Sequence, residues 1–145
     1  AIERLQAEYW DALDAKDWEG LRACLVEDFV FVNNTTGGRY EGREGMIATM
    51  QAKFSDGVTS SHHGHHHWID LIGDGTAVSH WALQDDLYDA GHGGEFVGRA
   101  HYDNAYVKID GQWRFTKMSL TYLRGEASIR KSSEDCANAY KVFMM

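Results

Sequence analysis

The part of the chain between residues 60 and 123 has the pattern of two long β-hairpins. The first joins SHHGHHHWIDLI to TAVSHWALQDDLYDA through GDG, and the second joins EFVGRAHYDNAYVKI to QWRFTKMSLTYL through DG. Short Gly- and Asp-containing turns between runs of β-branched and aromatic residues are typical of hairpins. We therefore predict a four-stranded antiparallel sheet, whose long strands twist and curl around the elements that pack on it.

The first third of the chain has helical spacing instead. Apolar residues recur at helical intervals in residues 2–13, Asp17 is a predicted N-cap for a second short helix, and REGMIATMQAKF returns to helical spacing. FVFV and RYEG between the helices are predicted short strands. Helices followed by long hairpins predict the α+β class, with a curved sheet wrapped around the N-terminal helices.

Length and composition fit one domain with an apolar interior. The 145 residues are 43% apolar and 12% aromatic, which is enough for a core and an apolar pocket. The net charge of −8, with no basic run, predicts repulsion from nucleic acids and from anionic membranes. No apolar stretch approaches the roughly 20 residues of a membrane helix. Two distant cysteines fit a reduced compartment, so we expect a cytoplasmic protein.

Five of the eight histidines lie in the run HHGHHH at residues 62–67. On a regular strand, His62 and His66 would share one face, and His63, His65 and His67 would share the other. The second face could present imidazoles to a metal ion, but the spacing supplies no carboxylate or further ligand. We favour a strand in which one histidine is catalytic and the others lie on an exposed or subunit-facing surface.

Asp14 is predicted near the C-terminal end of the first helix, where the helix dipole disfavours a carboxylate. Such a group needs a compensating partner, and a histidine on the facing strand would be one. An Asp-His pair in an apolar pocket can act as a general acid or base near neutral pH. The alternative is that Asp14 only caps the turn before Asp17.

The order of these elements, with the local patterns GDGTA and DGQWRF, resembles the SnoaL-like branch of the nuclear transport factor 2-like superfamily. The resemblance covers residues 1–124. It implies a single cone-shaped domain, with a curved antiparallel sheet around the helices and a deep apolar pocket, and no metal or organic cofactor. The C-terminal extension at residues 125–145, with a predicted helix from Ser133, could form a lid, a subunit contact or a frayed tail.

Within that superfamily the chain looks most like scytalone dehydratase, bile-acid 7α-dehydratase and hexachlorocyclohexane dehydrochlorinase. The resemblance implies a catalytic dyad of Asp14 and His62, with His63 in place of His62 if the strand slips by one residue. It places Tyr9 where it would assist the leaving group. It also gives the following strand an acidic residue, Asp85 or its neighbour Asp86. The expected substrate-binding residues are Trp10, His66, Trp81, Asn104 and Arg124.

The resemblance, together with these residues, implies a cofactor-independent lyase that eliminates water from a small, apolar, cyclic or aromatic substrate. The same dyad would also serve an isomerase, a cyclase or a carbon–carbon lyase that releases an aldehyde. The rival interpretations are a non-catalytic module that binds small ligands and, third, a metal-dependent enzyme, since fold alone does not fix function. We further expect a homo-oligomer, dimer or trimer, that pairs through the outer face of the sheet near Trp68 or Trp81.

Overall fold

The computed structural model describes residues 1–129, and the N-terminal part of this range is helical. Asp17 caps the second helix as predicted, because its side chain accepts a hydrogen bond from the Gly20 N–H at 3.0 Å. Lys16 directly follows the first helix as its C-cap and adopts the left-handed conformation. The helices are α1 (Ile2–Ala15), α2 (Trp18–Cys24) and α3 (Arg43–Lys53).

Six strands form one curved sheet in the order β2-β1-β6-β5-β4-β3. The two predicted hairpins supply its four longest strands. The expected sheet had four strands, all antiparallel; β1 and β2 extend it, and β1 runs parallel to β6. A parallel pair needs a long crossover connection, and here α3 and the strands β3 to β5 supply it. The strands are β1 (Leu25–Asn33), β2 (Gly38–Glu41), β3 (Val58–Gly73), β4 (Thr76–Asp89), β5 (Gly94–Ile109) and β6 (Gln112–Ile129).

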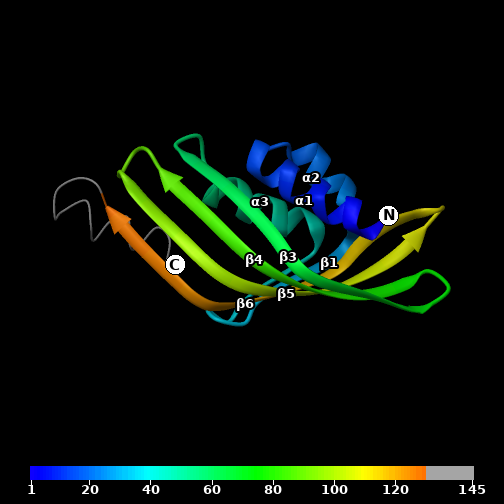
Figure 1. Cartoon of the computed structure of the whole chain (residues 1–145). Helices are drawn as coiled ribbons and strands as arrows, with labels where there is room; N and C mark the ends of the chain where they lie inside the picture. Colours follow the sequence, from blue (N-terminus) through cyan, green and yellow to red (C-terminus); the bar gives the residue numbers. More distant parts are fainter. Residues whose placement is uncertain (130–145) are drawn as a thin grey trace.

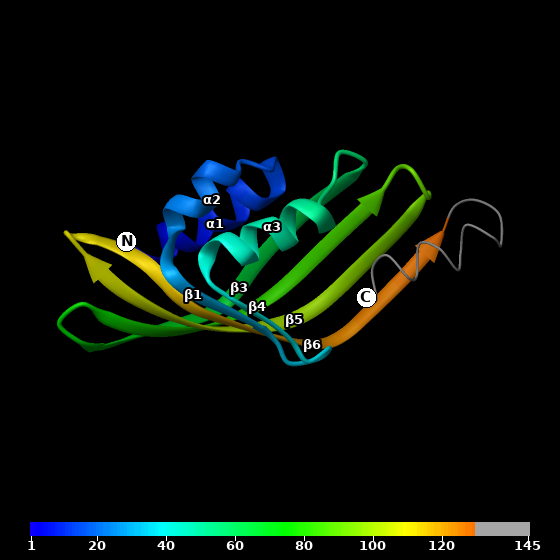
Figure 2. The same ribbon diagram turned by 180° about the vertical axis from the view of Figure 1, so that it is seen from behind.

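The three helices cover the concave face of the sheet (Figure 1). From behind, α3 is seen on the same side of the sheet as α1 and α2 (Figure 2). Every second residue of β4 from Ala77 to Asp89 is buried, so this strand turns one face to the helices along its whole length. That inward face includes the polar side chains of Ser79, Asp85 and Asp89. Because burying a polar group among apolar neighbours costs free energy, these three side chains are candidates for a functional role.

A β-bulge divides the histidine run in the middle of β3. The register with β4 shifts there, and His66 has a φ of 49°, in the left-handed region. Both His66 and His67 are exposed residues, but the ring of His67 stacks on the inward-facing Trp81 at 4.0 Å. The expectation that His62 and His66 share a face, with His66 toward the substrate, is therefore wrong, because the extra residue of a bulge shifts the alternation of side chains.

One further expectation needs correction. Trp81 was expected at an exposed subunit interface, but it lies on the inward face of β4 and is only 5% exposed; Trp68 is 50% exposed. Residues 125–129, the start of the predicted C-terminal extension, continue β6 and pair with β5. The predicted helix from Ser133 lies outside the described residues. Within residues 1–129, no helix has the length and apolar character to cross a bilayer.

Candidate active site

The structure brings Asp14, in the last turn of α1, against His62 on β3. His62 Nδ1 lies 2.6 Å from Asp14 Oδ1, and the His62 backbone N–H donates to Asp14 Oδ2 at 2.9 Å. The Ser60 hydroxyl donates to Asp14 Oδ1 at 2.8 Å. The side chain of His62 is only 4% exposed. By contrast, His63 is exposed, and its ring bonds to Ser61 on the outer face.

These contacts fix the charge and the tautomer of the pair. Burial of the Asp14 carboxyl opposes ionisation, but the hydrogen bonds and the positive charge of His62, with the hydrogen bond from Ser60, outweigh it and hold the pKa of Asp14 below its ordinary value of 3.8. Because an ionised carboxylate only accepts hydrogen bonds, Nδ1 of His62 must carry the hydrogen. The neutral ring then has its lone pair on Nε2, which can accept a proton.

The lowered pKa of Asp14 predicts a contribution to stability that is lost in acid. The carboxylate stabilises the fold above its unfolded-state pKa, and this contribution disappears as the pH falls through the lower pKa of the folded state. Between about pH 5 and about pH 2, the free energy of unfolding should therefore fall more steeply for wild type than for Asp14→Asn. Denaturant titrations at each pH measure this difference. Parallel curves for the two proteins would contradict it.

A second buried carboxylate, Asp85, lies opposite His62 in the pairing of β3 with β4. It is 2% exposed, and its Oδ2 accepts a hydrogen bond from the Tyr122 hydroxyl on β6, two strands away. This contact crosses β5 at Gly98, where a Cβ atom would overlap the Asp85 carboxylate and the Tyr122 ring. Within residues 1–129 the buried Oδ1 of Asp85 has no partner. A buried carboxylate oxygen without a donor is uncommon, and such an unpaired group suggests a functional role.

Two buried tyrosines, Tyr9 and Tyr102, lie near each other, and the field of both carboxylates reaches Tyr102. Burial, with a smaller effect of Cys24, raises the pKa of Tyr9, and its ring packs 5.3 Å from Phe115. Burial also raises the pKa of Tyr102. The neighbouring Tyr9, Tyr122, Asp85 and Asp14 raise it further, by smaller amounts. Neutral tyrosines in this position can donate hydrogen bonds but are poor net proton donors.

Aromatic rings close the site toward the start of α1. Trp10 packs edge-on against Trp81 at 5.4 Å and lies 6.3 Å from Tyr102. The Trp10 indole sits over Gly64, where a Cβ atom would overlap it. Asn104 belongs to a different buried cluster, in which its Nδ2 donates to Gln6 Oε1 at 2.9 Å. Trp10 is the expected substrate contact that lies beside Tyr102 and also has an unpaired donor. Its Nε1 has no hydrogen-bond partner within residues 1–129.

A cavity of about 280 Å³ opens between α3, β1 and β6. Tyr122 lines it, and so does Arg124, which the sequence placed at the substrate; the side chain of Arg124 is exposed and paired with Glu126. Asp14 and His62 are not among the lining residues, but Phe54, which follows the lining residue Lys53, lies 6.2 Å from the His62 ring. The apolar lining residues include Phe31, Met50, Leu87, Phe96 and Leu120.

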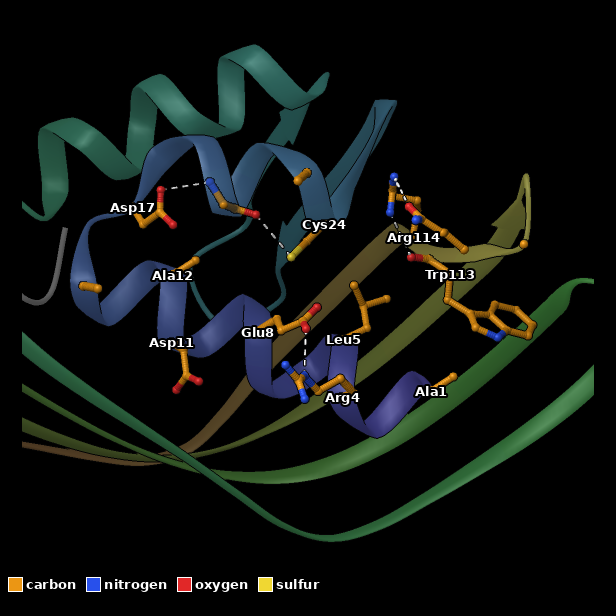
Figure 3. A pocket seen from close by; sticks show the side chains of 15 residues that line it. Ala1, Arg4, Leu5, Glu8, Asp11, Ala12, Asp17, Cys24, Trp113 and Arg114 are labelled. Carbon is orange, nitrogen blue, oxygen red and sulfur yellow. Dashed lines mark hydrogen bonds and ion pairs between the residues drawn. The ribbon is translucent and has the colours of Figure 1, made fainter.

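A larger hollow of about 790 Å³ lies on the other side of α1, toward α2 and the turn between β5 and β6 (Figure 3). Its wall carries the carboxylates of Glu8, Asp11 and Asp17, and Glu8 is paired with Arg4 at 2.7 Å. None of the predicted site residues lines it. The smaller cavity is lined by Tyr122, the hydrogen-bond donor to Asp85, and is therefore the better candidate for a substrate site despite its size.

A metal site built on the histidine run required His63, His65 and His67 on one face. The bulge separates His67 from the other two, and its Nε2 bonds to Glu3 at 2.7 Å. In the part of the chain that the structure describes, no group of three or more His, Cys, Asp or Glu side chains is arranged to hold a metal ion. The histidine run thus delivers one buried imidazole to Asp14.

Sequence reasoning did not single out Ser60, Lys53, Tyr102 or Tyr122. A signal for Tyr122 existed in Gly98, because a glycine inside a strand pattern often marks a close approach of other groups. Nothing in the sequence indicates which groups approach it, since they come from strands on either side.

A strongly curved sheet that wraps three helices and carries polar groups on its inner face defines the cone fold of nuclear transport factor 2-like proteins. The model of the SnoaL-like domain matches residues 1–119, and the chain belongs to this family.

Solved structures with the same fold carry different names. A proposed scytalone dehydratase of Novosphingobium aromaticivorans DSM 12444 is 23% identical, with a TM-score of 0.81 over 91% of this chain and 88% of its own. A hexachlorocyclohexane dehydrochlorinase of Novosphingobium barchaimii LL02 is 16% identical, with a TM-score of 0.78 and 90% of each chain covered. A proposed aromatic ring hydroxylase of Novosphingobium aromaticivorans is 17% identical, with a TM-score of 0.79 and 94% of each chain covered. At these identities the likeness shows a shared fold, and the activity must be argued from the site.

Proposed function

We propose that the protein is a lyase that removes water from a small cyclic or aromatic substrate, with His62 as the base and Asp14 as its partner. One observation carries the proposal: the buried His62 ring donates from Nδ1 to an ionised Asp14 at 2.6 Å. This arrangement leaves Nε2 as the acceptor and stabilises the imidazolium that forms. The dehydratase and dehydrochlorinase among proteins of this fold support the reaction class by analogy.

In the proposed elimination, Nε2 of His62 takes a proton from carbon, and the electrons of that C–H bond form the new double bond. The adjacent C–O bond breaks, and the departing hydroxyl receives the proton from the imidazolium, so that water leaves and His62 returns to its neutral form. Tyr9 and Tyr102 stay neutral, because burial raises the pKa of each, and serve as hydrogen-bond donors to the leaving oxygen. Asp85 orients a substrate hydroxyl through its free Oδ1.

A substrate of one or two rings suits the site. The cavity volume of about 280 Å³ lies just below the usual range for small-molecule sites, about 300–1,000 Å³. Its lining of aromatic and aliphatic side chains favours an apolar ring system and excludes water, which strengthens the hydrogen bonds of the site.

The Tyr122 hydroxyl should matter through Asp85. Tyr122→Phe removes the donor that holds Asp85 Oδ2, and a hydrogen bond to a charged group is worth enough to lower kcat/KM by about 10- to 100-fold. Steady-state kinetics on a hydroxylated substrate measure the effect. Tyr88→Phe, at an exposed tyrosine of the same sheet, is the matched control. Equal kcat/KM for Tyr122→Phe and wild type would remove Asp85 from the proposed mechanism.

The direct test is a turnover screen of cyclic β-hydroxy ketones and aryl alcohols, with products identified by mass spectrometry. Wild type, Asp14→Asn and wild type with a chelator are compared. Loss of water with wild type alone, unaffected by chelator, supports the proposal. Release of an aldehyde, or an isomer of unchanged mass, would assign the dyad to another reaction. Equal turnover by Asp14→Asn would refute the dyad, and loss of turnover with chelator would point to a metal.

A further inference from the structure

The small cavity has a charge opposite to that of the protein. The chain carries a net charge of −8, yet the fifteen residues that line the cavity include Lys53 and Arg124 and no Asp or Glu. The two cations lie on different elements, α3 and β6, so they converge on the cavity from two sides. In an acidic protein, a cavity with this lining attracts an anion from solution.

Lys53 is the cation that is available to a ligand. The guanidinium of Arg124 is already paired with Glu126, and both side chains are mostly exposed, which screens their field. Within residues 1–129, Lys53 forms no hydrogen bond or ion pair; its Nζ lies 5.9 Å from the centre of the Phe54 ring. Surrounding atoms that desolvate the ammonium lower the pKa of Lys53, and the field of Asp85 acts in the opposite direction. Because Lys53 is an exposed residue that lines the cavity, its ammonium is accessible to an anionic group of a ligand bound there.

The other residues that line the cavity favour a ligand with an aromatic ring. Phe31, Phe96 and Tyr122 offer aromatic rings, and Met50 and Leu120 add flexible apolar surface. Aromatic rings bind other rings through stacked or edge-on contacts in addition to burial of apolar area. A ligand that satisfies the cavity therefore combines an aromatic ring with one negative charge.

We propose that the cavity binds a small aromatic acid, whose ring packs among Phe31, Phe96 and Tyr122 and whose carboxylate pairs with Lys53. This inference names the substrate class of the site and so rests on the proposed function, although binding can be measured without turnover. It also narrows the substrate from an apolar ring to a ring with a single anionic group. A polyanion is not favoured, because the outer surface of the protein is acidic.

The test compares naphthalenecarboxylate with naphthalenecarboxamide, which has the same ring and nearly the same shape but no charge. In isothermal titration calorimetry at neutral pH and low salt, wild type should bind the acid about tenfold more tightly than the amide, as expected for a charge-assisted hydrogen bond. Lys53→Met should bind the two compounds within about threefold of each other, and Lys53→Arg should keep most of the preference. Added salt should weaken binding of the acid to wild type but not binding of the amide.

Lys108→Met is the matched control. Lys108 is exposed, its Nζ also lies 5.9 Å from an aromatic ring, that of Trp113, and it does not line the cavity. This variant should keep the full preference for the acid. Equal binding of acid and amide by wild type, or an unchanged preference in Lys53→Met, would overturn the inference. The same titrations with Asp14→Asn separate the two proposals: a Lys53-dependent preference that persists there supports the inference, whatever the turnover screen shows for the lyase.

Discussion

His62→Gln should lower kcat by about 10²- to 10⁴-fold on any substrate that wild type turns over, the range expected for loss of a general base. Glutamine is the informative replacement, because its side-chain amide can still donate a hydrogen bond to Asp14 but has no nitrogen lone pair that takes up a proton near neutral pH. The fold and the Asp14 contact should therefore survive while the base is lost. Single-turnover kinetics at saturating substrate measure the chemical step.

The neighbouring histidine provides a strict control for this prediction. His63→Gln makes the same chemical change one residue along β3, on the exposed face, where the ring bonds only to Ser61 in the described part of the chain. Turnover by His63→Gln should stay within about twofold of wild type, as for a surface substitution away from the site. A large loss with His63→Gln, or none with His62→Gln, would mean that the base has been assigned to the wrong residue.

Local signals indicated only part of the contact between Asp14 and His62. A carboxylate in the last turn of α1 opposes the helix dipole and so requires a partner. The choice of His62 as that partner followed from the resemblance to the SnoaL-like family. The hairpin turns likewise determined the pairing of β3 with β4 and of β5 with β6, since a short turn fixes the register of the strands that it joins.

Other features depend on contacts that no local pattern encodes. The bulge at His66 places His67 on Trp81 and Glu3, partners from β4 and α1, so its position is decided by packing across three elements. The contact between Asp85 and Tyr122 spans β5 and requires both the curvature of the sheet and the missing side chain of Gly98. Sequence alternation predicts which residues face inward but not which inward residues meet two strands apart.

Gly64, the glycine that interrupts the histidine run, should have a large effect on stability when it is replaced. Gly64→Ala should lower the free energy of unfolding by about 1–3 kcal/mol, the usual cost of extra volume in a packed core. The added methyl group would overlap the Trp10 indole, which cannot easily move because Trp81 and Tyr102 hold it on its other sides. Urea denaturation followed by circular dichroism measures the change.

Gly45→Ala is the control, because Gly45 lies in α3 with nothing near the position of the new methyl group. That variant should gain about 0.5–1 kcal/mol from helix propensity. A double-mutant cycle then isolates the cause: in a Trp10→Leu background, Gly64→Ala should cost much less than in wild type, because the smaller side chain leaves room. Equal costs in both backgrounds would show that backbone conformation, rather than the indole, requires glycine. If the cycle shows coupling, the Trp10 indole is the reason that glycine interrupts the run HHGHHH. Gly64 then leaves the space in which the indole forms the aromatic wall of the site.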